Sequence, residues 1–321
     1  VLTTTDKAGL VALKMVSDLD DQVSARSVGF GLAPRLNAAG RMGKADSGFH
    51  LLTSVDLKEA KVLAQRIDII NQERKNIQGQ VQEEAEYLIS REINLEEDRV
   101  IVLASKNFHS GVIGIVASRI VEKYFRPVVL IALEGLIGKG SGRSIPQFNL
   151  HRAFTDCSSH LVQFGGHAYA AGLTIKEENV DLFRNEIKKV GRKFLSEENL
   201  VPEIYLDIKL NISQINEELY KQITLVEPFG SENPPPIFLI QSVRISKLKK
   251  IGREKNHVRF QANQHDAKID AIGFNLAEEF ASIDLELNKV DLVCEFQIND
   301  WNGGNKLELK ILDLCCSVEK N

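Results

Sequence analysis

The sequence lacks the features that mark membrane, secreted and disulfide-linked proteins. Only four cysteines occur in 321 residues, none with a Cys-x-x-Cys spacing, and the adjacent Cys315 and Cys316 are poorly placed to bridge each other. No apolar run approaches the ~20 residues that span a bilayer, and the N-terminus lacks the charged-then-apolar layout of a signal peptide. We therefore expect a reduced, cytoplasmic protein without a membrane partner.

The sequence also lacks a surplus of one charge and the common catalytic fingerprints. Its 40 Lys and Arg residues are balanced by 44 Asp and Glu, so any nucleic-acid site has to be a local basic patch. The seven histidines form no close pair, and neither a P-loop nor a dinucleotide-binding glycine pattern is present. The acidic run at 18–21 is typical of a solvated helix end. The sequence therefore predicts no metal site in this chain.

The first part of the chain has the pattern of a connector followed by a long helix. In residues 1–55 we expect a helix near 7–20 and then a glycine-studded stretch with little regular structure. From residue 56 to 92, apolar residues recur at steps of three and four, which predicts one amphipathic helix of roughly 55 Å within the segment 56–95. A helix of this length usually joins two bodies.

Residues 96–197 have the pattern of a small α/β domain. Strand, helix and strand signals at 99–104, 111–125 and 127–133 predict a βαβ unit, and therefore a parallel or mixed sheet. Additional strands are expected at 136–144 and 172–176, with helices near 149–158 and 177–195.

From residue 198 to 321 the sequence changes to short alternating segments, interrupted by one helix at 213–223. Such regularly spaced strands, with a turn signal at 301–304, predict an all-β barrel of five or six strands, of the oligonucleotide-binding (OB) type. The strands are expected at 203–210, 237–251, 257–263, 267–274, 290–300 and 306–314.

A glycine-rich stretch at 165–172 has the composition of a phosphate-gripping loop. Gly165 and Gly166 precede His167, so the backbone can approach a ligand closely while the imidazole donates a hydrogen bond or a proton. The structural alternative is a glycine- and alanine-rich turn around a core histidine.

A second candidate phosphate site lies at 140–144, at the end of a predicted strand. Ser141 offers a hydroxyl and Arg143 a planar guanidinium, beside backbone N–H groups that the neighbouring glycines expose. An exposed polar hairpin is the alternative explanation.

Two basic features precede these loops. His109 sits between a predicted strand and helix, where the backbone N–H groups of a helix N-terminus favour an anion. In the connector, Arg35, Asn37 and Arg41 lie in an acid-free stretch of ten residues that also contains Lys44. An unremarkable loop histidine and a solvated basic loop are the alternatives.

The barrel segment carries the most basic stretch, with six cations against one acid over residues 247–259. Cations that follow a phosphate backbone and aromatic rings that stack on bases are what a single-strand groove requires. Alternatively, the rings are core and the lysines protect a sheet edge. The candidate cations are Lys247, Lys249, Lys250, Arg253 and Arg259, and the candidate rings are Phe260, Phe274, Phe296 and Trp301.

Taken together, five motifs resemble those of the RecJ family of single-strand-specific 5′→3′ exonucleases, within the DHH phosphoesterase superfamily. In order and spacing they cover most of the chain. The matching stretches are APRLNAAGR from Ala33, HSGVIGIVASRI from His109, GSGRS from Gly140, FGGHAYAAG from Phe164 and EPFGSENPPPIF from Glu227.

The resemblance implies that 96–197 is a DHHA1 domain and that 198–321 is an OB-fold domain. It also implies that the family's N-terminal domain, which carries the manganese-binding aspartates and the Asp-His-His motif, is absent. The start at Val1 rather than Met likewise indicates a fragment or a processed chain. By this resemblance Mn²⁺ or Mg²⁺ acts in the intact enzyme through two-metal hydrolysis, and this chain alone is expected to be an inactive monomer.

Carried over residue by residue, the resemblance assigns roles to the candidate residues. Ser141 and Arg143 would hold a 5′-phosphate, and His167 would face the scissile phosphate. Arg35, Asn37 and Arg41 would line the DNA path, and the basic barrel strand would hold single-stranded DNA further along. The parent protein would act in DNA repair and recombination, with a single-strand-binding protein or a helicase as further candidate partners.

Two other functions remain open from the sequence. The chain could be a stand-alone single-strand-binding or partner-docking module, which the barrel patch favours and the two glycine-rich loops disfavour. It could also belong to a related DHHA1 enzyme that acts on short oligoribonucleotides or cyclic dinucleotides, which the barrel and the EPFGSENPPPIF motif disfavour.

Overall fold

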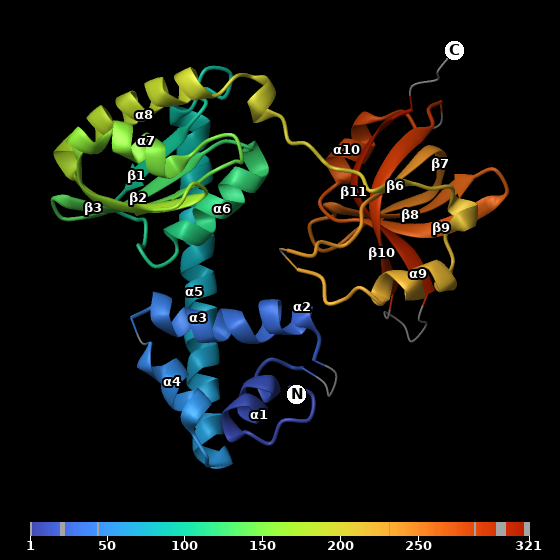
Figure 1. The fold of residues 1–321 in the computed structure, drawn as a ribbon, viewed down its shortest axis with the longest axis horizontal. Helices are drawn as coiled ribbons and strands as arrows, with labels where there is room; N and C mark the ends of the chain where they lie inside the picture. The colour runs from blue at the N-terminus through green and yellow to red at the C-terminus, as the bar shows by residue number, and fades with distance from the viewer. Residues whose placement is uncertain are drawn as a thin grey trace. The chain divides into compact units, whose positions relative to one another are not determined.

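The chain folds into two compact units, residues 1–202 and residues 203–321 (Figure 1). The computed structural model describes residues 2–19, 23–43, 45–230, 232–285, 287–299 and 306–317. Along these residues, no helix combines the length and apolar character needed to cross a membrane.

The first unit begins with short helices that pack on the N-terminal half of a long one. Their shared core contains Ala12, Leu13, Leu51, Ala64 and Ile67. The elements are α1 (Ala8–Met15), α2 (Ala25–Ser27), the π-helix η1 (Val28–Leu32), α3 (Ala33–Arg41), α4 (Asp46–Thr53) and α5 (Leu57–Glu92).

The expectation of little regular structure after the first helix is wrong, because 25–41 is continuously helical. Pro34 lies in the first turn of α3, directly after the π-helix η1. Ala38 and Ala39 are fully buried, so tertiary packing outweighs the local preference of the glycines for irregular backbone.

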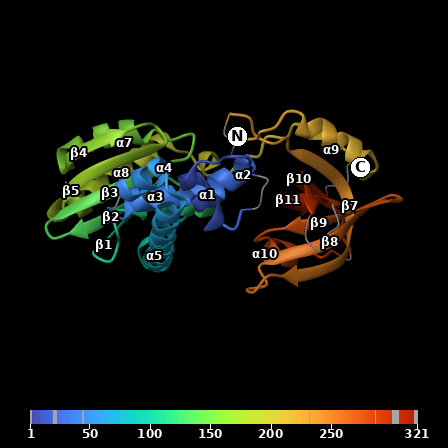
Figure 2. The same ribbon diagram turned by 90° about the horizontal axis from the view of Figure 1, so that it is seen from below.

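The predicted long helix is confirmed as α5, which has 36 residues. The Asp56 carboxylate accepts a hydrogen bond from the Lys58 backbone N–H and caps its start, and Ile93 returns to extended backbone at its end. In Figure 2 the view runs roughly along the axis of α5. Its N-terminal half packs on α1, α3 and α4, and its C-terminal half packs on the α/β sheet (Figure 1).

The α/β part is a five-stranded mixed sheet with helices on both faces. The strand order is β1-β2-β3-β5-β4, in which only β1 and β2 run parallel. Helices α7 and α8 pack against one face, whereas α5 and α6 pack against the other. The elements are β1 (Ile101–Ser105), α6 (Ile113–Tyr124), β2 (Val128–Glu134), β3 (Ile137–Arg143), α7 (Leu150–Asp156), η2 (Ser158–His160), β4 (Leu161–Gly166), β5 (Ala170–Lys176), η3 (Glu177–Asn179), α8 (Val180–Phe194) and η4 (Glu198–Leu200).

The sequence interpretation missed strand β4 and placed the start of β5 two residues late. Gly165 pairs with Gly172, and Gly166 pairs with Ala171, so the glycine-rich stretch is a hairpin and not an irregular loop. Glycine and alanine have low strand propensity, and only pairing across the sheet forms these strands.

The second unit is a closed five-stranded barrel with a core that includes Phe238, Ile240, Phe260 and Leu292. Its strands pair in the order β7-β8-β9-β11-β10, and β10 closes the barrel on β7. The elements are β6 (Ile208–Lys209), η5 (Ile212–Gln214), α9 (Glu217–Thr224), β7 (Phe238–Ile251), β8 (His257–Gln264), β9 (Ala267–Gly273), α10 (Ala277–Ser282), β10 (Val290–Asn299) and β11 (Lys306–Cys316).

The barrel confirms the expected all-β OB architecture but corrects three details. Of the segment expected as a strand at 203–210, only β6 pairs, and it does so with β7. The helix expected at 213–223 begins at Glu217, where Asn216 caps it, and α10 was not expected. The predicted turn at 301–304 lies outside the described residues.

Candidate nucleic-acid interface

Strand β3 alternates glycines with polar side chains, and this alternation places Ser141 and Arg143 on one face of the sheet. The glycines face the other way, into the core. A Cβ atom on Gly140 would lie 2.7 Å from the Leu173 side chain, so that face of β3 has no room for side chains. The GSGRS motif therefore lies largely in a strand with one glycine face packed into the core and one polar face.

Helix α6 begins directly over the polar face of β3. A Cβ atom on Gly114, in the first turn of α6, would lie 2.9 Å from Arg143 Nη2 and 3.0 Å from Ser141 Oγ. Glycine at this position thus leaves room for both side chains. Arg143 Nη1 donates hydrogen bonds to Ser141 Oγ (3.1 Å) and to the Gly142 carbonyl (2.8 Å). A hydroxyl, a guanidinium and the start of a 12-residue helix, all groups that favour anions, are thus brought together.

The charge of Arg143 is not compensated by an acid. Within the described part of the chain, no carboxylate forms an ion pair with it. Burial lowers the pKa of the Arg143 guanidinium below its usual value, and the nearby positive charge of Arg41 lowers it further. An anion bound here would remove this repulsion.

His109 and Arg41 lie beside the start of α6. The Gly111 N–H donates to His109 Nδ1 at 3.0 Å, so Nδ1 is the acceptor nitrogen and Nε2 is left to donate. Arg41 Nη1 donates to the Gly111 carbonyl at 3.4 Å. A Cβ atom on Gly111 would lie only 2.3 Å from the Arg41 carbonyl oxygen, so α3 contacts this turn directly.

The turn that carries His167 is held against the end of β3. The Ser144 N–H donates to the Tyr169 carbonyl at 3.0 Å, and the His167 N–H donates to the Ala170 carbonyl at 2.8 Å. Gly166 has a φ of +139°, and a Cβ atom there would lie 2.5 Å from the Ala170 carbonyl oxygen, so only glycine fits. The His167 side chain is exposed.

The three connector residues divide between the two sides of α3. Asn37 and Arg41 are four residues apart and both are exposed, so they share one helix face. The Arg35 side chain is only 13% exposed; its Nε pairs with Asp68 of α5 at 2.8 Å. Arg35 therefore links α3 to α5. No sequence signal separates its role from those of Asn37 and Arg41.

In the barrel, the predicted basic hairpin exposes most of its cations. Lys247, Lys249, Lys250 and Arg253 are exposed, and within the described residues none of them forms an ion pair. Lys247 also lines a pocket of about 540 Å³ between β7 and the segment that leads to β10. Arg244 and Lys289 are the other cations of this pocket.

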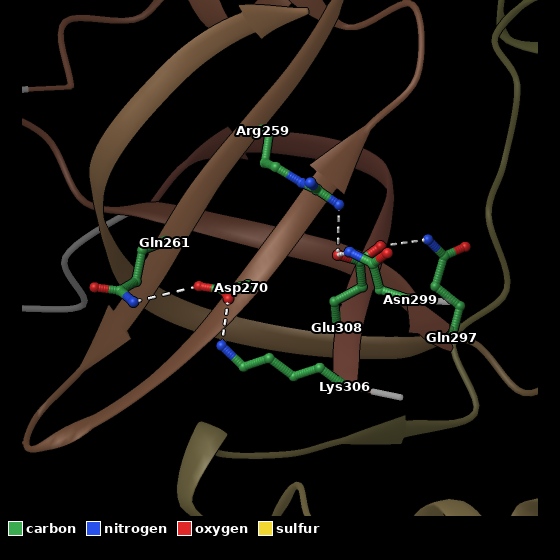
Figure 3. Close-up of polar contacts among 7 residues, drawn as sticks. All are labelled: Arg259, Gln261, Asp270, Gln297, Asn299, Lys306 and Glu308. Carbon is green, nitrogen blue, oxygen red and sulfur yellow. Dashed lines mark hydrogen bonds and ion pairs between the residues drawn. The ribbon is translucent and has the colours of Figure 1, made fainter. Parts of the chain in front are cut away.

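Arg259, in contrast, takes part in a polar network on the barrel (Figure 3). The Glu308 carboxylate is only 3% exposed and accepts hydrogen bonds from Arg259 (3.1 Å), Gln297 (2.8 Å) and Asn299 (2.9 Å). The ion pair neutralises Arg259, which leaves a smaller basic patch than the sequence count indicates.

The candidate rings of the barrel are mostly structural. Phe260 is buried against Phe280, and Phe296 stacks on the buried Phe238 with ring centroids 4.2 Å apart. Phe274 is 45% exposed, and its ring meets the His257 ring edge-on with centroids 5.4 Å apart. Trp301 lies outside the described residues.

The described residues offer no ligand set for a divalent metal. Across the ranges that the structure describes, no three His, Cys, Asp or Glu side chains gather in a way that could hold an ion. Mn²⁺ and Mg²⁺ prefer several clustered oxygen ligands, so they do not fit the groups found here.

Comparison with known families assigns both units. The model of the DHHA1 domain matches residues 97–193, and the model of the RecJ OB domain matches residues 206–313. Curated relatives named single-stranded-DNA-specific exonuclease RecJ match nearly the whole chain. The chain belongs to the RecJ family.

RecJ of Bacillus subtilis (strain 168) is 35% identical over 319 residues, which cover 98% of this chain and 40% of that protein. RecJ of Escherichia coli (strain K12) is 32% identical over 95% of this chain and 54% of its own length. The chain thus spans about half the length of the curated relatives it matches. The crystal structure of Thermus thermophilus RecJ in complex with Mn²⁺ matches with a TM-score of 0.83 at 28% identity, over 98% of this chain and 45% of that one.

The sequence interpretation missed two residues that shape the candidate sites, one in each unit. Gly114 belongs to the matched motif HSGVIGIVASRI, yet only the structure shows that it makes room for Ser141 and Arg143. A glycine in the first turn of a helix was the available signal. Glu308, by contrast, lies in an alternating strand in which nothing marks it as buried.

The barrel network predicts a specific loss of stability in acid. The hydrogen bond from Lys306 (2.5 Å) holds the pKa of the Asp270 carboxyl below its usual value, although partial burial opposes this shift (Figure 3). Because the pKa is lower in the folded state, the stabilisation is present above the usual carboxyl pKa and is lost as the pH falls through the folded value. We expect Asp270→Asn to destabilise the barrel at pH 7 and to have little effect near pH 3.

Urea unfolding followed by fluorescence tests this prediction, because the single tryptophan, Trp301, lies in the barrel half of the sequence. Asp266→Asn, an exposed carboxylate in the turn between β8 and β9, is the matched control. An equal effect of Asp270→Asn at both pH values would contradict the assigned role of the ion pair.

Proposed function

We propose that this chain holds single-stranded DNA for a 5′→3′ exonuclease, and that Ser141 and Arg143 take its 5′-terminal phosphate. The observation that carries the proposal is the half-buried Arg143 guanidinium, which has Ser141 and Arg41 beside it and no carboxylate partner within the described residues. A phosphate group supplies the negative charge and the acceptor oxygens that this arrangement lacks.

The neighbouring residues would guide the strand past this site. Exposed Arg41 and Asn37 follow the phosphate backbone along α3, and His109 donates a hydrogen bond from Nε2. Arg35 supports this path by fastening α3 to α5. These roles rest on the geometry around the start of α6.

The hairpin turn would bring the strand to the point of cleavage. Gly165 and Gly166 let the DNA backbone approach the β4–β5 hairpin closely, and His167 faces the scissile phosphate.

The barrel would hold the single strand further from its 5′ end. Lys247, Lys249, Lys250 and Arg253 are exposed and unpaired within the described residues, on the first hairpin of an OB fold. The loop between the first two strands of this fold commonly contacts oligonucleotides. Arg259, which is paired with Glu308, would support the strand that carries this patch and would add little free charge to it.

Hydrolysis itself would depend on the part of a RecJ protein that this chain does not match. Solved RecJ structures contain Mn²⁺ or Mg²⁺, and the RecJ relatives are about twice as long as this chain. We infer that the remaining part of such a protein binds the metal and that this chain supplies cations and hydrogen-bond donors. The unpaired cysteines fit a reducing, cytoplasmic setting for this work on DNA.

The phosphate assignment predicts that this chain prefers 5′-phosphorylated single-stranded DNA to the same oligonucleotide with a 5′-hydroxyl. Arg143→Met should weaken binding of the phosphorylated strand about tenfold, because one charge-assisted contact is lost, and should leave the hydroxyl strand unaffected. Lys249→Glu/Lys250→Glu should weaken both strands and reduce the salt dependence of binding. Fluorescence anisotropy at two salt concentrations measures these affinities.

Arg152→Met is the matched control, because the Arg152 guanidinium lies over the Phe194 ring, 4.9 Å from its centroid, and away from Ser141. It should leave the preference for the 5′-phosphate unchanged. Equal affinity of the unmodified chain for the two strands would contradict the proposal.

If the rest of the protein carries out hydrolysis, this chain alone should bind DNA without degrading it. Incubation of the labelled, 5′-phosphorylated strand with the chain and Mn²⁺ should leave its length unchanged on a denaturing gel. Shortening of the strand that disappears in a His167→Ala variant would overturn the assignment of hydrolysis to the rest of the protein.

A further inference from the structure

Three buried residues of α5, each about one helical turn from the next, are polar in an otherwise apolar face. Asn71, Arg74 and Gln78 are 1%, 8% and 4% exposed, and they continue the spacing of the apolar positions before and after them. The buried residues of α5 are Ala60, Ala64, Ile67, Ile70, Asn71, Arg74, Gln78, Val81, Ala85 and Ile89. Ala60, Ala64 and Ile67 belong to one core, and Val81, Ala85 and Ile89 belong to another, so the polar segment lies between the two cores.

The Arg74 guanidinium is held by neutral partners only. Nη1 donates to Gln78 Oε1 at 2.8 Å, and Nη2 donates to Asn71 Oδ1 at 3.1 Å. Arg74 Nε is buried without a hydrogen-bond partner, and no carboxylate of the described chain pairs with this residue. A buried, uncompensated charge costs stability, and a Glu at either amide position would remove that cost.

Two neighbouring cations act on the pKa of Arg74 in the same direction as its burial. Burial lowers the pKa of Arg74 below its usual value, and the charges of Arg41 and Arg119 lower it further. Arg41 acts in the same way on Arg143. Arg41 thus lies within electrostatic range of both the buried guanidinium of α5 and the phosphate site of β3.

We propose that Arg74 is a positioning residue for phosphate binding, acting through Arg41. Its buried charge raises the positive potential at the Arg41 guanidinium, which donates to the Gly111 carbonyl just before α6, and the first turn of α6 lies against Ser141 and Arg143. Asn71 and Gln78 fix the Arg74 side chain with amide oxygens that hold it without neutralising it. The inference rests on the proposed function, since it assigns Arg74 to the site that takes the 5′-phosphate.

The sharpest test is Gln78→Glu, which keeps the acceptor oxygen and adds the missing negative charge. We expect the melting temperature to be unchanged or higher, because Arg74 gains an ion pair. Affinity for 5′-phosphorylated single-stranded DNA should fall on the order of tenfold, the size of one partly screened charge–charge interaction, with no change for the 5′-hydroxyl strand. A purely structural Arg74 would show better stability and unchanged binding.

Gln80→Glu is the matched control, since it makes the same change of charge on the exposed face of α5 and should leave binding unchanged. Arg74→Met removes the same charge without adding an acid and should weaken phosphate binding similarly, whereas Arg74→Lys should restore most of it. These two variants keep the test valid if Gln78→Glu does not fold.

Two outcomes overturn the inference, and they are distinguishable. If the unmodified chain prefers the 5′-phosphate and Gln78→Glu and Arg74→Met retain that preference in full, this inference alone is wrong. If the unmodified chain shows no preference, the proposed function is wrong and the inference fails with it.

Discussion

A surplus of guanidinium charge without matching carboxylates is the constraint on which the interface of the first unit depends. Burial lowers the pKa of both Arg143 on β3 and Arg74 within α5, and the positive charge of Arg41, at the end of α3, lowers both pKa values further. The partly buried Lys188, by comparison, forms an ion pair with Asp98 at 2.9 Å. Under the proposed function, the bound phosphate is the anion that compensates Arg143.

The elements around this site are arranged so that the charges stay close without an intervening acid. Gly114 lets the start of α6 lie against Arg143 and Ser141, and Gly111 lets the same turn meet the end of α3. The sheet supplies the rigid support, since the glycines of β3 pack into its core. A Cβ atom at Gly111 would lie 2.3 Å from the Arg41 carbonyl oxygen, and one at Gly114 would displace the Arg143 guanidinium.

Much of this organisation could be predicted from the sequence, because long periodic segments determine their own structure. The spacing of Ala60, Ile67, Val81 and related residues predicts α5, and the alternating strands predict the barrel. The helices of 25–41 and strand β4 could not be predicted, because tertiary packing forms them against the local preference of their glycines. The pairing of Arg259 with Glu308 joins residues 49 positions apart, which no local pattern reveals.

The measurement that tests the central claim most directly is a crystal structure of this chain bound to a short 5′-phosphorylated single strand. The account predicts the terminal phosphate against Ser141 Oγ and the Arg143 guanidinium, with Arg41 beside it. A terminal phosphate bound elsewhere, with Arg143 left unpaired, would contradict the assignment of the uncompensated charge to phosphate binding.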